Sequence, residues 1–281
     1  MGTRPVKHHD KYARPALKHS LGQNFILDSV LQEELAGLTG LGKDDQVLEI
    51  GAGSGMFTAA LAQRVGQLTA VELDAEMIPY LKAAVLQYPN VTVIQQDILK
   101  MDWKAYAETH GPFHIAANLP YHVTTALLTQ IMGQTLPIES IHLMLQRESA
   151  EKLCAEPGDE GYGPMTLIVA WRYTAEIRKY VPREAFTPAP RVDSAFISLV
   201  RRDQPPCRVN DENLMFGLIQ AGFAHRRKTL LNNLMNRYQL PREAIIRWLG
   251  LAHIPADARA EQVSLREWAS LADAYTDQAI C

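Results

Sequence analysis

The feature that most constrains this fold is an alternation of short β-rich runs with helix-length segments between residues 46 and 202. The runs are apolar, which is typical of strands buried on both faces, and the longer segments between them suit crossover helices. Five runs have this character: 47–50, 68–71, 91–94, 114–117 and 141–145. The pattern predicts an α/β fold, with a mostly parallel sheet covered by helices on both faces.

Two further β-rich runs, at 175–181 and 194–200, flank a proline-rich loop. We expect them to pair at one edge of the sheet and to bring it to seven strands. Residues 203–206 then resemble a linker, and the β pattern stops. Four helix-like segments follow: 214–224, 228–238, 243–249 and 265–275. We therefore expect an α/β domain over residues 1–204 and a small all-helical domain over residues 205–281.

Composition gives weaker constraints. Of the 281 residues 47% are hydrophobic, which is enough for a sizeable core, and no run of about 18 apolar residues suggests a membrane span. Residues 1–20 are basic and lack the apolar stretch of a secretory signal, and we expect them to be flexible. Cys154, Cys207 and Cys281 lie far apart and are odd in number. They favour a reducing, cytoplasmic location over a disulfide framework or a zinc site.

The formal net charge of −3 argues against a uniformly basic coat, but positive charge is concentrated in two segments. Residues 1–25 hold five lysines and arginines against one aspartate, and residues 201–240 hold seven against three acidic residues. Both segments could attract phosphate. The alternative is a solubilising tail and an ordinary charged helix face, and charge alone does not separate the two interpretations.

A glycine-rich turn, Glu-Ile-Gly-Ala-Gly-Ser-Gly at 49–55, follows the first strong β run and opens a helix. Glycines let the backbone turn sharply and let a ligand approach the helix N-terminus. A dinucleotide fingerprint would place its third glycine at position 56, which is Met56. Glycine stands instead at 51, 53 and 55, which fits a nucleotide–methionine cofactor better than NAD. Alone, such a turn also occurs as a plain strand-to-helix connection.

Two acidic residues follow the next two β runs. Glu72 ends the second run, where a carboxylate can accept both hydroxyls of a ribose. Asp97 follows the third run, where a carboxylate can accept hydrogens from an adenine amino group. Each alone could be a helix cap or a turn residue. Together with the glycine turn they favour a cofactor site, because open α/β sheets bind ligands at the carboxyl ends of their strands.

The fourth β run ends in Asn118-Leu119-Pro120-Tyr121. The nitrogen of an exocyclic base amine is a poor nucleophile while its lone pair is conjugated into the ring. The Asn118 oxygen and a nearby backbone carbonyl can accept its hydrogens and orient the lone pair, while Pro120 keeps the backbone rigid. The Tyr121 ring can stack on a flipped base. Alignment and desolvation of the amine would then accelerate methyl transfer, and no strong base would be needed.

A second aromatic side chain, Phe186, begins the proline-rich loop that enters the last β run. Two prolines, Pro188 and Pro190, stiffen this loop. Phe186 is therefore placed to close the other side of a base pocket. The alternative is a core phenylalanine under a proline-rich loop.

From roughly Leu21 to its end the chain resembles the KsgA family of ribosomal RNA adenine dimethyltransferases. Five blocks carry the resemblance: 22–25, 49–55, 71–74 with 96–97, 118–121 and 186–194. A sixth block, 223–234, resembles the start of the family's C-terminal domain and favours the small-subunit enzyme over relatives that methylate large-subunit RNA. The resemblance implies a Rossmann-like class I methyltransferase domain and S-adenosyl-L-methionine as cofactor. We expect a monomer without a metal site or a membrane.

The resemblance also implies the substrate: two adjacent adenosines in the 3′-terminal hairpin loop of small-subunit (16S) rRNA, each dimethylated late in assembly on the immature 30S particle. By matched position, nine residues would contact the cofactor: Asn24, Ile26, Gly51, Gly53, Glu72, Leu73, Asp97, Ile98 and Asn118. Five would hold the target adenine: Asn118, Leu119, Pro120, Tyr121 and Phe186. Arg226, Arg227 and Lys228 would bind RNA.

The chain departs from the family pattern in three places. Ala52 and Ser54 replace a Pro and a Leu of the glycine turn, and His-Val-Thr-Thr at 122–125 replaces Asn-Ile-Ser-Thr. Lys-His-Ser-Leu at 18–21 replaces a more basic, aromatic run, which leaves the strength of RNA contact there open. Two alternatives remain: an assembly factor that acts mainly by binding the immature small subunit, and a methyltransferase of large-subunit RNA or DNA.

Overall fold

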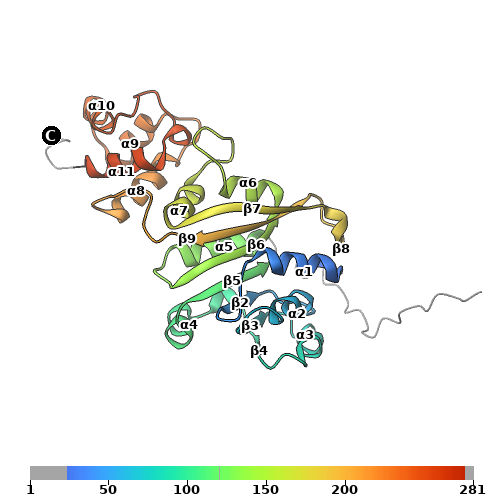
Figure 1. Cartoon of the computed structure of the whole chain (residues 1–281). Helices are drawn as coiled ribbons and strands as arrows, with labels where there is room; N and C mark the ends of the chain where they lie inside the picture. The colour runs from blue at the N-terminus through green and yellow to red at the C-terminus, as the bar shows by residue number, and fades with distance from the viewer. Residues whose placement is uncertain (1–23, 120, 276–281) are drawn as a thin grey trace, which may run out of the picture.

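The computed structural model describes residues 24–119 and 121–275 (Figure 1). The strands are β1 (Phe25–Ile26), β2 (Gln46–Ile50), β3 (Gln67–Glu72), β4 (Val91–Gln95), β5 (Phe113–Asn118), β6 (Ile138–Gln146), β7 (Tyr173–Val181), β8 (Phe186–Thr187) and β9 (Ser194–Arg201). The first seven helices are α1 (Ser29–Leu38), α2 (Met56–Ala62), α3 (Ile78–Val85), α4 (Trp103–His110), α5 (Tyr121–Met132), α6 (Arg147–Leu153) and α7 (Pro164–Arg172). The last four are α8 (Glu212–Gly222), α9 (Leu230–Tyr238), α10 (Arg242–Leu251) and α11 (Leu265–Asp273), and short 3₁₀ turns are η2 (Ile98–Lys100), η3 (Arg183–Ala185) and η4 (Ala260–Gln262).

The main sheet has seven strands in the order β4-β3-β2-β5-β6-β9-β7. β9 runs antiparallel to both β6 and β7, and the remaining neighbours are parallel. The expected mostly parallel sheet and its closing pair at one edge are both confirmed. The chain winds outward from β2 to β3 and β4 and then returns, so that β5 pairs with the other side of β2. The gap between β2 and β5 is therefore a topological switch point, where open α/β sheets bind ligands.

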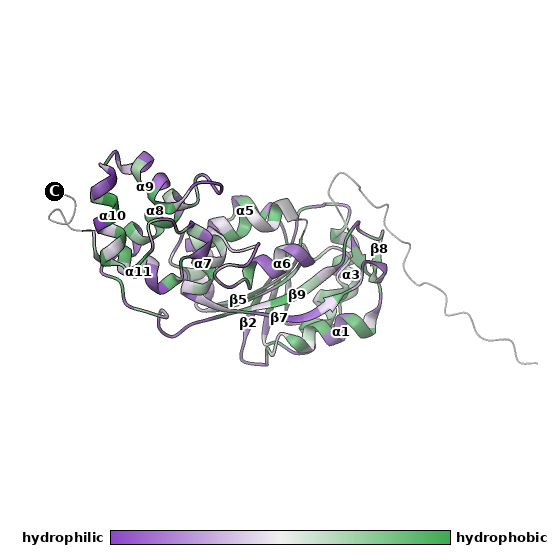
Figure 2. Cartoon of the chain, turned by 90° about the horizontal axis from the view of Figure 1, so that it is seen from above, coloured by the Kyte–Doolittle hydropathy of each residue, from purple (hydrophilic) through white to green (hydrophobic). Residues whose placement is uncertain are grey.

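Helices cover both faces of this sheet (Figure 1). One face packs Leu48 and Ile50 of β2 against α4 and α5 in the largest apolar cluster. The other face packs Val47 against α1 and α2. Between its two buried end residues, the edge strand β7 alternates exposed residues with partly buried ones, and Figure 2 gives much of this strand the hydrophilic colour. An edge strand has a hydrogen-bonded neighbour on one side only. Exposed charged residues on it discourage pairing with another chain.

Side-chain caps mark where several helices begin. Asp28 accepts hydrogen bonds from two backbone N–H groups of α1, and Asp102 does the same for one N–H of α4. Thr229 caps α9, and Ser264 forms a capping box with Glu267 at the start of α11. Each cap satisfies a backbone donor that the helix itself leaves unpaired. The polar residues before these helices thus fix their first turns.

The C-terminal helices α8 to α11 form their own apolar cluster around Trp248 and Trp268. The same cluster includes Leu167 and Trp171 of α7, so these helices pack directly on the α/β part (Figure 1). β9 ends at Arg201 and α8 begins at Glu212, which brackets the expected boundary at 204. The division into two domains stays a prediction. No helix in the described part of the chain is long and apolar enough to cross a membrane.

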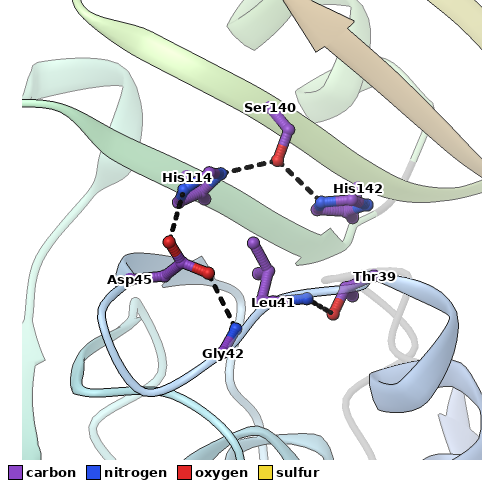
Figure 3. A network of polar contacts seen from close by, with 7 residues as sticks. All are labelled: Thr39, Leu41, Gly42, Asp45, His114, Ser140 and His142. Atoms are coloured by element: carbon purple, nitrogen blue, oxygen red, sulfur yellow. Dashed lines mark hydrogen bonds and ion pairs between the residues drawn. The ribbon is translucent and has the colours of Figure 1, made fainter.

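Polar side chains of β5 and β6 form a hydrogen-bonded chain on the face of the sheet toward the loop before β2 (Figure 3). The Ser140 hydroxyl lies 2.7 Å from His114 Nδ1 and 2.8 Å from His142 Nε2. His142 Nδ1 lies 2.9 Å from the Ser198 hydroxyl, and His114 Nε2 lies 3.4 Å from Asp45. Buried polar groups of this kind are stable only when every member has a partner. The network therefore links the loop before β2 to β5, β6 and β9.

Burial lowers the pKa of His142 to about 3, with smaller contributions from the positive charges of His114 and Arg178. The imidazole is 1% exposed, so its neutral form is the one that fits the folded protein. In the unfolded chain the same group takes up a proton below pH ~6.5. Folding stability from this group is therefore complete above pH ~6.5 and falls as the pH drops toward 3.

The free energy of unfolding should decrease less steeply with falling pH in His142→Asn than in wild type. Between pH 6 and 4.5 the wild-type histidine accounts for about 1.4 kcal/mol per pH unit, because one proton binds only the unfolded chain. Urea unfolding at several pH values measures this slope. His253→Asn replaces an exposed histidine and is the matched control. Equal slopes in both variants would contradict the assignment.

Candidate active site

A cavity of about 350 Å³ opens at the carboxyl ends of β2, β3, β4 and β5, beside the switch point. The nine residues expected to contact a cofactor all line it: Asn24, Ile26, Gly51, Gly53, Glu72, Leu73, Asp97, Ile98 and Asn118. Leu119, expected at the target base, lines it as well. The structure thus brings together residues that the sequence distributes over almost a hundred positions. Their roles stay predictions.

The glycine turn after β2 forms one wall of this cavity. The N–H groups of Gly51 and Ala52 donate to the Val71 carbonyl at 2.9 and 3.2 Å. Gly51 has φ +74°, and a Cβ at this position would lie 2.5 Å from Leu119 Cδ2. Gly53 has φ +55°, and a Cβ there would lie 2.6 Å from the Phe25 ring. Only glycine suits both the positive φ and the close approach of Leu119 and Phe25 at these two positions.

Glu72, at the end of β3, is 8% exposed and holds the turn in place. Its Oε2 accepts the Gly53 N–H at 2.7 Å, and its Oε1 accepts the Asp74 N–H at 2.7 Å. Each carboxylate oxygen has a second lone pair. The carboxylate can therefore orient the loop and still receive a hydroxyl from a ligand in the cavity.

Asp97 follows β4 and has two roles open to it. Its side chain caps η2 by accepting the Leu99 N–H at 3.0 Å, so it acts as the capping residue that was one interpretation of the sequence. Its other oxygen lies 3.7 Å from the exposed Lys100 ammonium. The carboxylate also lines the cavity, and capping leaves lone pairs for a ligand.

The turn after β5 reaches the same cavity. Asn118 is the last residue of β5, and the Leu119 side chain packs beside Gly51. The Thr124 hydroxyl of α5 donates to the Leu119 carbonyl at 3.5 Å. Pro120 and the side chain of Tyr121 lie outside the described residues, although the backbone of Tyr121 begins α5. Their predicted roles at the target base stay untested.

A small two-stranded sheet that the sequence did not predict closes one side of the cavity. β1 and β8 pair antiparallel, with Ile26 opposite Phe186. This pairing places Phe25 over the glycine turn and Ile26 in the lining. Phe186 itself is 5% exposed and packs with Met144 and Phe196, so it is a core residue here and lies outside the cavity lining. Its stacking role stays a prediction.

Glu49 also lines the cavity, and sequence reasoning assigned it no role. It lies on β2 and is 2% exposed. The pKa of this carboxyl is raised to about 8, mainly by burial and to a lesser extent by the negative charge of Glu72, while the Thr58 hydroxyl opposes the rise. The sequence shows that Glu49 stands at the start of the glycine turn, but it does not show that the side chain is buried.

The basic triplet lies elsewhere in the fold. Arg226, Arg227 and Lys228 are exposed in the turn between α8 and α9. Arg226 donates to the Glu160 carbonyl at 3.0 Å, so its guanidinium leans toward the loop before α7. The structure does not bring the triplet into the cavity lining. Within residues 24–119 and 121–275, no group of three or more histidine, cysteine or acidic side chains is placed to hold a metal ion.

An open sheet with a glycine turn, two acidic strand ends and an antiparallel closing strand defines the Rossmann-like methyltransferase class. Residues 15–277 match the family described as Ribosomal RNA adenine dimethylase, and the chain belongs to that family.

Curated relatives and solved structures agree with this membership. Ribosomal RNA small subunit methyltransferase A of Geobacillus thermodenitrificans is 40% identical over 269 residues, which cover 92% of this chain and 91% of that protein. The protein of the same name from Streptococcus pneumoniae is 36% identical, covering 94% and 93%. The crystal structure of the 23S rRNA methyltransferase ErmE has a TM-score of 0.71 at 26% identity, covering 89% and 98%. A dimethyladenosine transferase from Plasmodium falciparum has a TM-score of 0.73 at 22% identity, covering 88% and 95%, and shows the same fold.

We expect Gly51→Ala to weaken binding of S-adenosylmethionine by roughly tenfold, because a side chain at positive φ is strained and its methyl displaces Leu119. Isothermal titration calorimetry measures the affinity, and thermal unfolding shows whether the fold survives. Gly158→Ala is the matched control, since Gly158 has φ +97° and no heavy atom within 4 Å of an added Cβ. Wild-type affinity in Gly51→Ala would show that the turn does not border the ligand.

Proposed function

We propose that this protein dimethylates the exocyclic amines of two adjacent adenosines in the 3′-terminal hairpin loop of small-subunit rRNA, on the immature 30S particle in the cytoplasm. The observation that carries the proposal is the Asn118-Leu119 turn, which lines the same cavity as the glycine turn and the two acidic strand ends. Such a turn has no purpose in a protein that only binds RNA. The relatives at 36–40% identity, both described as small-subunit enzymes, support the choice of substrate.

The residues present fit S-adenosylmethionine as the cofactor. Added Cβ atoms at Gly51 and Gly53 would collide with Leu119 and Phe25, so glycine at both positions keeps the turn packed against these two residues, which line the same cavity. Glu72 would accept ribose hydroxyls, and Asp97 would accept hydrogens from the adenine amino group. When bound, this cofactor supplies a methyl group made reactive by its positively charged sulfur.

The chain's own residues would prepare the target amine. Asn118 Oδ1 and the Leu119 carbonyl are acceptors at the cavity wall, and two acceptors hold both hydrogens of an amine so that its lone pair points into the cavity. The amine nitrogen becomes cationic as its new bond to carbon forms, and it then loses a proton to water. Water is a strong enough base to take this proton, so the reaction needs no basic side chain. Alignment and exclusion of solvent therefore account for most of the rate.

We expect Asn118→Ala to lower methyl transfer to undermethylated small subunits by about 10²-fold or more, because the amine loses an oriented acceptor. Incorporation of labelled methyl groups measures this, and wild type should transfer about four methyl groups per particle, two for each adenosine. Affinity of the variant for the particle should stay close to that of wild type. A wild-type protein that binds the particle and transfers nothing would favour the assembly-factor alternative.

Charge reversal at Arg226 and Arg227 should weaken binding to the immature small subunit by at least about tenfold, because phosphate contacts supply much of the affinity for RNA. Cofactor affinity should not change, since neither residue lines the cavity. Arg242→Glu with Arg247→Glu alters the same charge on exposed positions of α10 and is the matched control. Filter binding at several salt concentrations compares the pairs, and equal losses in both would rule out a specific role for the turn.

A further inference from the structure

The turn between α8 and α9 carries three consecutive cations in a short connection. Arg226, Arg227 and Lys228 are all exposed. In the described part of the chain, no carboxylate lies within ion-pair distance of any of them. Neighbouring like charges repel each other, so a flexible connection would let the three side chains spread apart. A turn that presents them together to an anion therefore needs a backbone that is held in place.

The side chain of Asn233, on α9, holds this backbone from the inside of the C-terminal helices. Asn233 is 3% exposed. Its Nδ2 donates to the Gly222 carbonyl at 2.5 Å and to the His225 carbonyl at 3.2 Å. Gly222 is the last residue of α8, and the last carbonyls of a helix have no partner within it. One amide group thus joins the end of α8 to the residue that precedes the first cation.

The hydrogen bonding of Asn233 is one-sided. Both hydrogens of its Nδ2 are used, whereas its buried Oδ1 has no partner among the described residues. A buried acceptor without a donor costs free energy, which offsets part of what the two donated bonds contribute. The clearest consequence of this side chain is therefore the geometry of the turn that it holds.

Backbone contacts fix the rest of the turn. The Lys228 N–H donates to the His225 carbonyl at 2.9 Å, the same oxygen that Asn233 reaches. At the far end, the Leu230 N–H donates to the Ala258 carbonyl at 2.8 Å. The turn is thus fixed at its first residues by Asn233 and at the start of α9 by the loop before η4.

Resting on the proposed function, we propose that Asn233 is a positioning residue for RNA binding. Its two hydrogen bonds hold the turn so that Arg227 and Lys228 meet the phosphate backbone of the rRNA as a fixed pair. A loop that is ordered before binding loses less conformational entropy when the complex forms. Because Asn233 is buried, it acts through the turn and does not contact the RNA itself. Its loss should reduce affinity without removing any contact to phosphate.

The variant Asn233→Leu removes both donors and keeps a similar side-chain volume and the same charge. Asn90→Leu is the matched control, since the Asn90 Nδ2 donates to the carbonyls of Ala62 and Val65, both at 3.0 Å. Those carbonyls lie at and just after the end of α2. The control therefore loses the same two hydrogen bonds at a helix end that lies far from α9 (Figure 1).

Filter binding to immature small subunits at several salt concentrations compares these variants with Arg227→Gln. We expect Asn233→Leu to bind roughly five- to tenfold more weakly than wild type, because the turn must be ordered on binding. Its salt dependence should match wild type, since the same phosphates are contacted. Arg227→Gln should lower the slope of log affinity against log salt by about 0.7–0.9, because one phosphate contact is lost. Equal affinity of Asn233→Leu and Asn90→Leu would overturn the proposal.

A double-mutant cycle separates positioning from a purely structural role. Asn233→Leu is combined with Arg227→Gln and Lys228→Gln. If Asn233 acts through these two cations, its loss should cost less than about twofold in affinity once they are neutral. A full additive loss would overturn the proposal, and so would wild-type affinity in the neutralised turn without Asn233→Leu. The cycle measures binding alone, so a wild type that transfers no methyl groups would overturn only the proposed function.

Backbone order in the unaltered protein gives an independent readout if Asn233→Leu folds poorly. NMR relaxation of the amides of Arg226, Arg227 and Lys228 reports their motion before any RNA binds. We expect order parameters of about 0.85, equal to those of α8 and α9, although all three residues are exposed. Order parameters clearly below those of the two helices would show that Asn233 does not fix the turn and would overturn the proposal.

Discussion

The carboxylate of Glu72 ties together the two loops on which the site depends. Its hydrogen bonds to the N–H groups of Gly53 and Asp74 join the turn after β2 to the end of β3. Hydrogen bonds to a charged acceptor contribute about 1.5–3 kcal/mol each, more than neutral ones. They fix the glycine turn at the topological switch point, against Leu119 on one side and Phe25 on the other. This side chain therefore holds one wall of the cavity in place.

The sequence predicts much of this arrangement because its signals are local. Apolar runs separated by helix-length segments define parallel strands, and parallel strands bring their carboxyl ends to a common edge. Gly51, Glu72, Asp97 and Asn118 each end or follow such a run, so placing them together requires only the order of the strands. The antiparallel pair β7 and β9 could be expected in the same way from its proline-rich connection.

Other features depend on contacts between distant parts of the chain and leave no local pattern. The pairing of β1 with β8 joins two-residue strands, too short for periodicity to reveal, and it buries Phe186 where a base-stacking position had been considered. The charge state of Glu49 likewise depends on its burial and on the neighbouring Glu72. His142 is neutral because the assembled sheet removes it from water. In each case the residue type is visible in the sequence, but its environment is not.

The central claim is that the cavity at the switch point binds the methyl donor next to the Asn118 turn. A crystal structure of the protein with S-adenosylhomocysteine tests it most directly. The account predicts the ribose beside Glu72, the adenine beside Asp97, and the sulfur facing the Asn118-Leu119 turn. A ligand bound on another surface, or one that enters the cavity with its sulfur pointing away from Asn118, would contradict the account.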